Sequence, residues 1–219
     1  MFKSKYSNFL TIILVVAIVA ILSITAALVV NVYKKYKNNR EATTAIAEFE
    51  NSLNDEIQTS NQELVEQNVV ITSNDASTGN GTRKLKYYNN FIMIGYIEIP
   101  KIKIKYPILE EETVASLEQS VAVRYPARAK LNEPGNVVIV GHNYRNGMFF
   151  SNLKKVVVGD KVKITDETGK TLTYTIYEIY ETTPEDVEYI TRDTANNTEI
   201  TLVTCTDDSK ARIVVKAKV

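Results

Sequence analysis

The only cysteine of this 219-residue chain, Cys205, ends an apolar, β-branched run, Thr201-Leu-Val-Thr-Cys205. A polar turn follows at 206–210, and a second apolar run begins after Arg212. This pattern predicts two strands joined by a turn, with the thiol and the guanidinium close together. A thiolate is a strong nucleophile toward carbonyl carbon, and a fixed guanidinium stabilises the oxyanion that the attack creates. The segment therefore favours acyl-transfer chemistry.

Such chemistry also needs a proton donor for the leaving amine. The chain has one histidine, His142, at the end of another apolar run, Asn136-Val-Val-Ile-Val-Gly-His142-Asn143. Each residue alone has an ordinary interpretation: a small buried thiol, a surface imidazole, or a weak ion pair with Asp207 or Asp208. All three residues, however, stand where an apolar strand meets a polar loop, and sites concentrate at such positions.

The charge balance and the cysteine count argue against several kinds of function and site. The chain has 26 Lys and Arg residues and 26 Asp and Glu residues, so it shows no basic excess for nucleic-acid binding. A single cysteine excludes an intramolecular disulfide and a cysteine-rich zinc site. A reactive thiol remains as the interpretation of Cys205.

The amino-terminal part predicts a membrane anchor. After a tail at 1–8, the segment 9–30 is apolar and uncharged, and about 20 such residues span a bilayer core. A signal peptide has a shorter apolar region, so a retained helix is the better interpretation. Basic residues flank both ends, and the positive-inside rule slightly favours a cytoplasmic location for the C-terminal side, which carries Lys34, Lys35, Lys37 and Arg40.

The next segments predict a spacer. A helical stalk is expected at 31–72, because apolar residues recur at helical steps, namely Ala42, Ile46, Phe49, Leu53 and Ile57. A coiled-coil seam is the less favoured alternative, since the heptads are too few. The segment 73–90 contains a small, polar, glycine-containing stretch and is predicted to be a flexible linker.

The remainder, 91–219, predicts a domain of short strands. Strands are expected at 94–100, 102–109, 136–141, 161–165, 171–180, 201–205 and from 212, and short helices at 112–120 and 183–190. The Thr183-Pro184 pair predicts the start of the last helix. The segment 121–130 is ambiguous. Many short strands with few helices favour an all-β barrel or sandwich.

These motifs carry a family resemblance. Thr201-Leu-Val-Thr-Cys205 resembles the TLxTC signature of the sortases, the cysteine transpeptidases of Gram-positive bacterial surfaces. Val140-Gly-His142-Asn143 and Arg212-Ile-Val-Val resemble the strands that supply their histidine and arginine, and the resemblance covers about 95–219. It implies a closed, mixed eight-stranded β-barrel, in which His142 and Cys205 meet, and a short helix at 148–153 after the histidine strand.

The resemblance also implies roles. Cys205 would form a thioester with a sorting-signal peptide of a secreted surface protein, Arg212 would stabilise the oxyanion, and His142 would protonate the leaving amine. A cell-wall precursor amine would resolve the thioester. The segment 181–197 would form a wall of the peptide site, and further substrate-binding candidates are Val203, Thr204 and Ala122.

Location, class and cofactors follow from the same resemblance. It implies a single-pass membrane protein with an extracellular catalytic domain, against the charge rule. The GHN and RIVV motifs resemble class B, whereas the short segment 180–199 resembles classes A and D. Some sortases bind calcium through loop carboxylates, but Glu110-Glu111-Glu112 has no recognisable ligand spacing, so no metal or cofactor is expected, with calcium left open.

Two other functions remain open. The chain could be a non-catalytic, membrane-anchored β-domain that binds surface peptides, with an inert Cys205. It could also be a thiol hydrolase that uses water as the acceptor. The reactivity of the thiol separates the first alternative from an enzyme, and the products formed with and without an added amine separate the second.

Overall fold

The computed structural model describes residues 5–66 and 85–219. They divide into two compact units, 1–39 and 40–219. The helices and strands are α1 (Lys5–Glu66), β1 (Lys86–Tyr88), β2 (Phe91–Ile99), η1 (Pro100–Ile102), β3 (Ile104–Leu109), α2 (Val114–Leu117), β4 (Val121–Tyr125), β5 (Gly135–Val140), η2 (Leu153–Lys155), β6 (Lys161–Asp166), β7 (Thr171–Thr182), β8 (Thr198–Cys205) and β9 (Arg212–Lys218).

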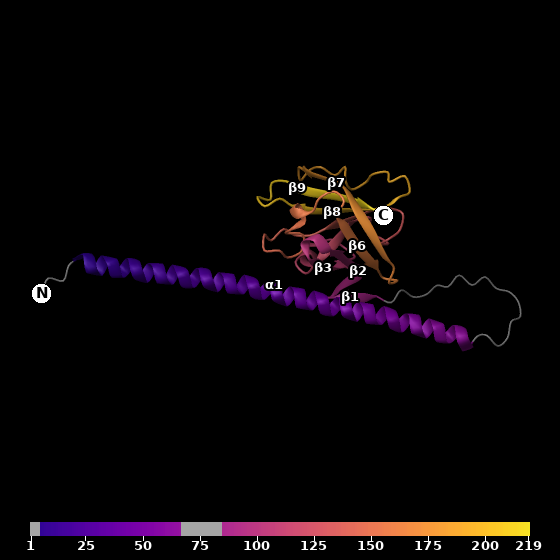
Figure 1. The fold of residues 1–219 in the computed structure, drawn as a ribbon, viewed down its shortest axis with the longest axis horizontal. Coiled ribbons are helices and arrows are strands. Elements are labelled where there is room, and N and C mark those ends of the chain that lie inside the picture. The colour runs from indigo at the N-terminus through magenta and orange to yellow at the C-terminus, as the bar shows by residue number, and fades with distance from the viewer. Residues whose placement is uncertain (1–4, 67–84) are drawn as a thin grey trace, which may run out of the picture. The chain divides into compact units, whose positions relative to one another are not determined.

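The strands form one sheet that closes on itself (Figure 1). Its order is β1-β2-β3-β4-β5-β8-β9-β7-β6, and β2 also pairs with β6. Closure therefore runs through the eight strands β2 to β9, while β1 adds a short piece beside β2. The β3–β4 and β5–β8 pairs are parallel and the others antiparallel, which confirms the predicted mixed eight-stranded barrel.

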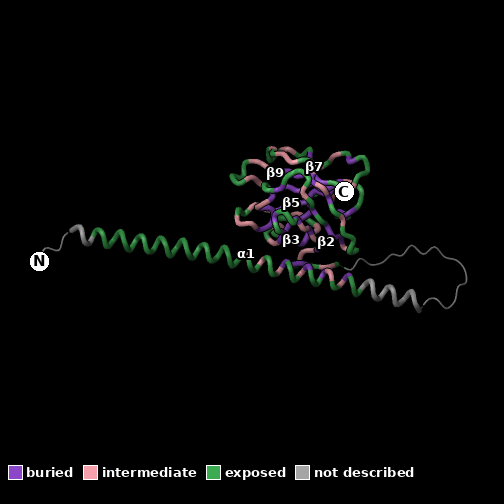
Figure 2. The backbone as a smooth tube through the Cα atoms, in the orientation of Figure 1, coloured by how far each residue is buried: buried purple, intermediate pink, exposed green. Residues whose placement is uncertain are grey.

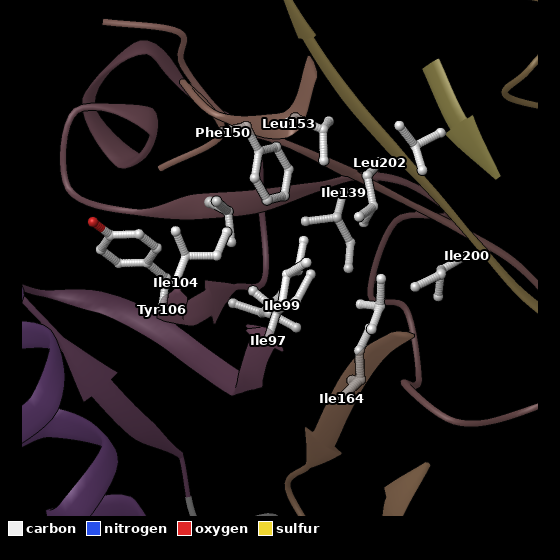
Figure 3. Packing of buried hydrophobic residues seen from close by; sticks show 14 of the residues in the cluster. Ile97, Ile99, Ile104, Tyr106, Ile139, Phe150, Leu153, Ile164, Ile200 and Leu202 are labelled. Carbon is white, nitrogen blue, oxygen red and sulfur yellow. The ribbon is translucent and has the colours of Figure 1, made fainter. Parts of the chain in front are cut away.

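The barrel interior is filled by alternate side chains from all sides. Ile97 and Ile99 of β2 meet Ile139 of β5, Ile164 of β6 and Leu202 of β8 in one buried cluster (Figure 3). All five are fully buried. This two-residue alternation is what the sequence pattern of half-buried strands required.

The closing contact between β2 and β6 depends on a glycine. Gly95 has φ +156°, and a Cβ at this position would lie 2.2 Å from the carbonyl oxygen of Thr165. Because the two backbones approach so closely, a larger residue at this position would force the closing strands apart.

The helix predicted at 183–190 does not form; the segment is a series of turns. The carboxylate of Asp186 accepts hydrogen bonds from the Thr182 hydroxyl (2.5 Å) and the Glu188 amide (2.8 Å). Such side-chain bonds offer the backbone an alternative to the helical ladder. The prediction at 148–153 is also wrong in type, because that segment consists of turns ending in η2. The short helix predicted within 112–120 is present as α2.

The amino-terminal unit contains an apolar helix, as predicted for the anchor. Among the described residues, one helix, in the range Phe9–Asp55, is long and apolar enough to cross a membrane. Its apolar window is fully exposed, unlike the interior of the barrel (Figure 2).

The later part of α1 belongs to the same compact unit as the barrel. Ile46, Phe49 and Leu53 are buried in a cluster with Met93 of β2 and Leu109 of β3. The predicted stalk helix is thus present as far as Glu66, but its apolar stripe packs within the unit 40–219.

The predicted spacer is only partly covered by the structure. Residues 67–72 of the predicted stalk and 73–84 of the predicted linker lie outside the described residues. Lys86–Tyr88, which was assigned to the linker, instead pairs with β2 as strand β1, so the folded sheet begins earlier than the predicted residue 91.

Candidate active site

Strands β8 and β9, with the loop that follows β5, carry the predicted catalytic residues. In the antiparallel β8–β9 pair, Cys205 stands directly opposite Arg212. In the parallel β5–β8 pair, the last paired residues are Val140 and Val203, two residues before His142 and Cys205 respectively. Beyond this pairing, the side chain of Asn143, the residue after His142, donates to the carbonyl of Cys205 (3.0 Å). Since adjacent strands lie about 4.8 Å apart, the thiol and the guanidinium originate from neighbouring backbones.

The Cys205 and Arg212 side chains belong to the outer face of the barrel. Val140, Val203 and Val214 share one buried cluster outside the barrel core. Cys205 and Arg212 each lie two residues from one of these valines on the same strand, and side chains two apart on extended backbone share a face. His142 follows Val140 of this cluster in the loop after β5. The three residues therefore lie next to an apolar floor.

The loop that carries His142, called the histidine loop below, is hydrogen-bonded to β8, the strand that carries Cys205. The Gly141 amide donates to the Val203 carbonyl (3.1 Å), and the Thr204 hydroxyl donates to the Gly141 carbonyl (2.7 Å). A Cβ on Gly141 would lie 2.8 Å from side-chain atoms of both Phe150 and Val121. A glycine is needed before His142 because the chain passes so close to the core.

Opposing influences act on His142. Partial burial lowers the pKa of the imidazole, and the carboxylates of Glu118 and Glu112 act against it. The ring also packs on Tyr144, with 4.9 Å between ring centroids. The neutral imidazole is thus favoured near pH 7, while the two carboxylates support the protonated form that a general acid requires.

The thiol and the guanidinium are both accessible. Cys205 is a free, partly exposed cysteine, and Arg212 is also partly exposed. The Arg212 Nη1 atom donates to the Ala211 carbonyl (3.2 Å). The turn aspartates have other partners: Asp207 pairs with Lys154, and Asp208 accepts from the Thr206 hydroxyl (2.7 Å).

The predicted substrate-binding residues fall into three different places. Val203 is in the outer apolar cluster next to the cysteine. Ala122 is in the separate cluster that contains Phe49 of α1, although Leu117 packs against both clusters. The Thr204 hydroxyl is buried and bonded to Gly141, so this side chain supports the histidine loop, and a role of the Thr204 backbone in substrate binding stays a prediction.

The segment 183–197, between β7 and β8, covers part of the apolar floor. Tyr189 is buried in the same cluster as Val138 and Val203, and Ile190 packs against that cluster. Sequence reasoning anticipated a wall here but named neither side chain. The expected helix hid the signal, because the two residues were assigned to its end.

A buried polar group anchors this covering segment. The Asn136 amide nitrogen donates to the carbonyls of Tyr189 and Ile190, both at 3.1 Å. The Asn136 oxygen accepts from Arg192 (3.2 Å) and from the Thr201 hydroxyl (2.8 Å). One β5 side chain thus connects the covering segment to the strand that carries the cysteine.

An ion pair extends this anchor. Arg192 pairs with Glu199 at 2.5 Å, and both side chains are largely buried, with 17% and 7% exposed. The Tyr177 hydroxyl donates to the same carboxylate (2.7 Å). Nothing in the local sequence pattern distinguishes these residues from ordinary surface charges, because their partners lie on three different strands or loops.

The acidic run considered for calcium lies elsewhere. Glu110, Glu111 and Glu112 line a cavity of about 490 Å³ together with Arg124 and Arg128. Arg124 approaches Glu112 at 3.6 Å. Within 5–66 and 85–219, no group of three or more His, Cys, Asp or Glu side chains is arranged to hold a metal ion. The expectation of no cofactor stays a prediction.

Comparison with known proteins identifies the family. The sortase domain model matches residues 97–219. Sortase A of Streptococcus agalactiae is 35% identical over 136 residues, and sortase A of Staphylococcus aureus is 30% identical over 131 residues. These alignments cover 59% and 57% of this chain but only 54% and 61% of the two relatives.

Solved structures agree. A Clostridium perfringens sortase D5 transpeptidase is 30% identical, with a TM-score of 0.58, covering 82% of this chain and 98% of that chain. A lid mutant of Corynebacterium diphtheriae sortase A is 32% identical, with a TM-score of 0.53, covering 57% and 69%. The relatives carry different class labels, so the class stays a prediction. The family model covers more than half of the residues, and the chain belongs to the sortase family.

Proposed function

We propose that this protein is a cysteine transpeptidase that acts on a sorting-signal peptide near the C-terminus of secreted surface proteins. The observation that supports this most is the convergence of Cys205 on β8, Arg212 opposite it on β9, and the loop of His142 after β5, beside an apolar floor. A nucleophile, a proton-transfer group and a fixed cation at neighbouring positions are what acyl transfer requires.

In the first half-reaction the Cys205 thiolate attacks the scissile carbonyl carbon. The C–S bond forms, and the carbonyl π electrons move to the oxygen, where Arg212 stabilises the negative charge. When the tetrahedral adduct collapses, the C–N bond breaks, and the proton of the His142 imidazolium passes to the leaving amine. The products are a thioester on Cys205 and a neutral imidazole.

In the second half-reaction an amine of a cell-wall precursor attacks the thioester. Neutral His142 accepts the proton that the attacking amine loses, and Arg212 again stabilises the oxyanion. The C–S bond breaks, a new amide forms, and the thiolate and imidazolium are restored. Because the two half-reactions use opposite forms of His142, opposing influences on its pKa suit the cycle.

The test is capture of the thioester. The full chain in detergent micelles is incubated with a peptide library of LPxTG-like and NPxTN-like signals, and intact-mass analysis reads acyl adducts. We expect an adduct on the wild type and none on Cys205→Ala. If the thiol of the folded wild type resists a methanethiosulfonate reagent, the non-catalytic alternative is favoured instead.

An added amine separates transfer from hydrolysis. We expect a new amide product whose yield rises with the amine concentration. A purely hydrolysed product at high amine concentration would support a thiol hydrolase and contradict a transpeptidase.

We also propose that the segment 9–30 anchors the protein in the cell membrane as a single span, with the barrel outside. The exposed apolar helix supports the anchor, and the family's substrates support the orientation. Because Cys205 is the only cysteine, a membrane-impermeant thiol reagent applied to intact cells should label the wild type. Labelling that occurs only after lysis would place the barrel inside.

A further inference from the structure

We propose that Asn143 is a positioning residue that holds the histidine loop and the cysteine loop in register, an inference that rests on the proposed function. A short gap separates the end of the β5–β8 strand pairing from the reacting groups. No strand pairing extends to His142 itself, because β5 ends at Val140.

Beyond the last paired residues of β5 and β8, side-chain hydrogen bonds connect the two segments. Backbone pairing between β5 and β8 reaches Val203, to which the Gly141 amide still donates (3.1 Å). One residue further along, the Thr204 hydroxyl donates to Gly141. Two residues further along, the Asn143 amide nitrogen donates to the carbonyl of Cys205 at 3.0 Å. This last contact joins the residue after the histidine to the nucleophile itself.

The same amide nitrogen reaches the loop beyond the cysteine. It donates to the Asp207 carboxylate at 2.9 Å, and Asp207 also pairs with Lys154. These contacts lower the pKa of Asp207, with the Lys154 bond as the main cause and the Asn143 bond next. An ionised Asp207 therefore accepts from Asn143 at neutral pH, which favours the two-loop contact.

The oxygen and the nitrogen of the Asn143 side-chain amide make hydrogen bonds to different loops. Its oxygen accepts from the Arg145 backbone amide (3.0 Å), a bond inside the histidine loop. Its nitrogen makes only the two contacts described above with the cysteine loop. A local turn needs the oxygen, whereas the connection between His142 and Cys205 needs the nitrogen.

This connection matters because proton transfer is sensitive to small displacements. A misplacement of about 1 Å lowers a rate by roughly a hundredfold, and catalytic side chains need support from neighbouring hydrogen bonds. His142 and Cys205 lie on different chain segments, so any separation of the loops changes the distance between imidazole and thiol directly.

The decisive variant is Asn143→Asp, which keeps the oxygen for Arg145 and removes the donor. The carboxylate would also face Asp207 and the Cys205 carbonyl, both acceptors. Asn143→Ala removes both functions. Asn146→Ala is the matched control, because the Asn146 oxygen accepts only within its own loop, from Met148 (3.0 Å).

We expect Asn143→Asp and Asn143→Ala to lower kcat for thioester formation by about tenfold to a hundredfold, with KM changed less than threefold. Alkylation of Cys205 by iodoacetamide, which needs no histidine, should stay within about threefold of the wild type. Asn146→Ala should retain kcat. A kcat within twofold of the wild type in both Asn143 variants overturns the proposal.

Amide hydrogen exchange tests the connection without relying on activity. Asn143→Asp should speed exchange at least tenfold in both 142–147 and 206–211, whereas Asn146→Ala should act on 142–147 alone. Faster exchange in only one loop, or throughout the barrel, contradicts the proposal. If the wild type captures no peptide, the proposed function fails, and this exchange pattern still decides the role of Asn143.

Discussion

At the scale of single residues, the environment of His142 matters most because the proposed cycle uses both protonation states of its imidazole. Burial disfavours the imidazolium, and the carboxylates of Glu118 and Glu112 favour it. The balance between burial and these charges sets the pKa of His142. This pKa can be measured directly, because the chain has a single histidine.

We predict that His142 titrates below its ordinary pKa, and that Glu118→Gln lowers this pKa further by removing a favourable charge. The only imidazole signals in the NMR spectrum report the titration. Glu98→Gln, on β2, is the control and should leave the pKa unchanged. A pKa above 6.5 in the wild type would contradict the prediction.

The same shift has a consequence for stability. Because the pKa is lower in the folded state than in the unfolded state, the unfolded chain binds the proton first as pH falls. The contribution of His142 to stability is thus present above the unfolded pKa, about 6.5, and is lost as pH falls through the folded pKa. We predict that His142→Gln flattens the urea-unfolding free energy in this pH window; an unchanged profile would contradict it.

Arg212 supports a second prediction at this scale. Arg212→Lys should lower kcat for thioester formation by about a hundredfold, because an ammonium does not reproduce the planar fork of the guanidinium. Peptide-capture kinetics measure the loss. Arg128→Lys, at an exposed arginine, is the control. Near-normal rates in Arg212→Lys would remove this residue from the site.

At the scale of elements, the segment between β7 and β8 is held by polar contacts in place of helical structure. Asn136 binds its backbone, and the Arg192–Glu199 pair ties it to β8. A largely buried ion pair that loses one partner leaves an uncompensated charge, which is costly even where the intact pair contributes little net stability.

We predict that Arg192→Ala lowers the free energy of unfolding by about 3 kcal/mol. Urea denaturation measures the change. The exposed pair of Lys163 and Glu98, at 4.0 Å, is the comparison, and Lys163→Ala should cost less than about 1 kcal/mol. The double variant Arg192→Leu/Glu199→Leu should recover part of the loss; equal costs for Arg192→Ala and Lys163→Ala would contradict the prediction.

At the scale of the whole molecule, α1 contributes to two units. Its first part is exposed and apolar, and its part from Arg40 belongs to the catalytic unit. Phe49 is 2% exposed, its ring contacts Tyr96 edge to face at 6.3 Å, and Glu50 pairs with Lys105 at 3.2 Å. The apolar stripe is thus occupied within one chain, which argues against its use as a dimer seam.

We predict that Phe49→Ala destabilises the full chain in detergent micelles by about 3 kcal/mol, as for other buried aromatic truncations. Thermal or urea unfolding measures the effect. Glu48→Ala, exposed on the same helix, should be close to neutral. A change in oligomeric state without a loss of stability would instead support the coiled-coil alternative.

Local patterns were sufficient for much of this protein. The alternation around Ile97, Ile164 and Leu202 predicts strands, because one face of each strand must be buried. The apolar run at 9–30 predicts a membrane helix from length and charge alone. The motifs around His142, Cys205 and Arg212 could be recognised for a similar reason: each residue stands at or just beyond the end of an apolar run, and this is a local property.

Other features depended on partners far away in the chain. Asp186 and its neighbours replaced the helix expected from Thr183-Pro184 with turns, since side-chain bonds competed with the helical ladder. The bond of the Thr204 hydroxyl to Gly141, in the loop after β5, could not be predicted from the residues around Thr204. The apolar stripe on α1 could be predicted from the sequence, whereas the surface that it packs against could not.

By itself, the sequence determined which residues are candidates for chemistry, the apolar helix and most of the strands, because residue type, hydrophobic length and two-residue alternation are local properties. Only the tertiary structure decided that Cys205 stands opposite Arg212, that Asn143 spans two loops, and that Asn136 and Arg192 hold the covering segment. Strand order and barrel closure set these contacts, and both arise from pairings between residues that are distant along the chain.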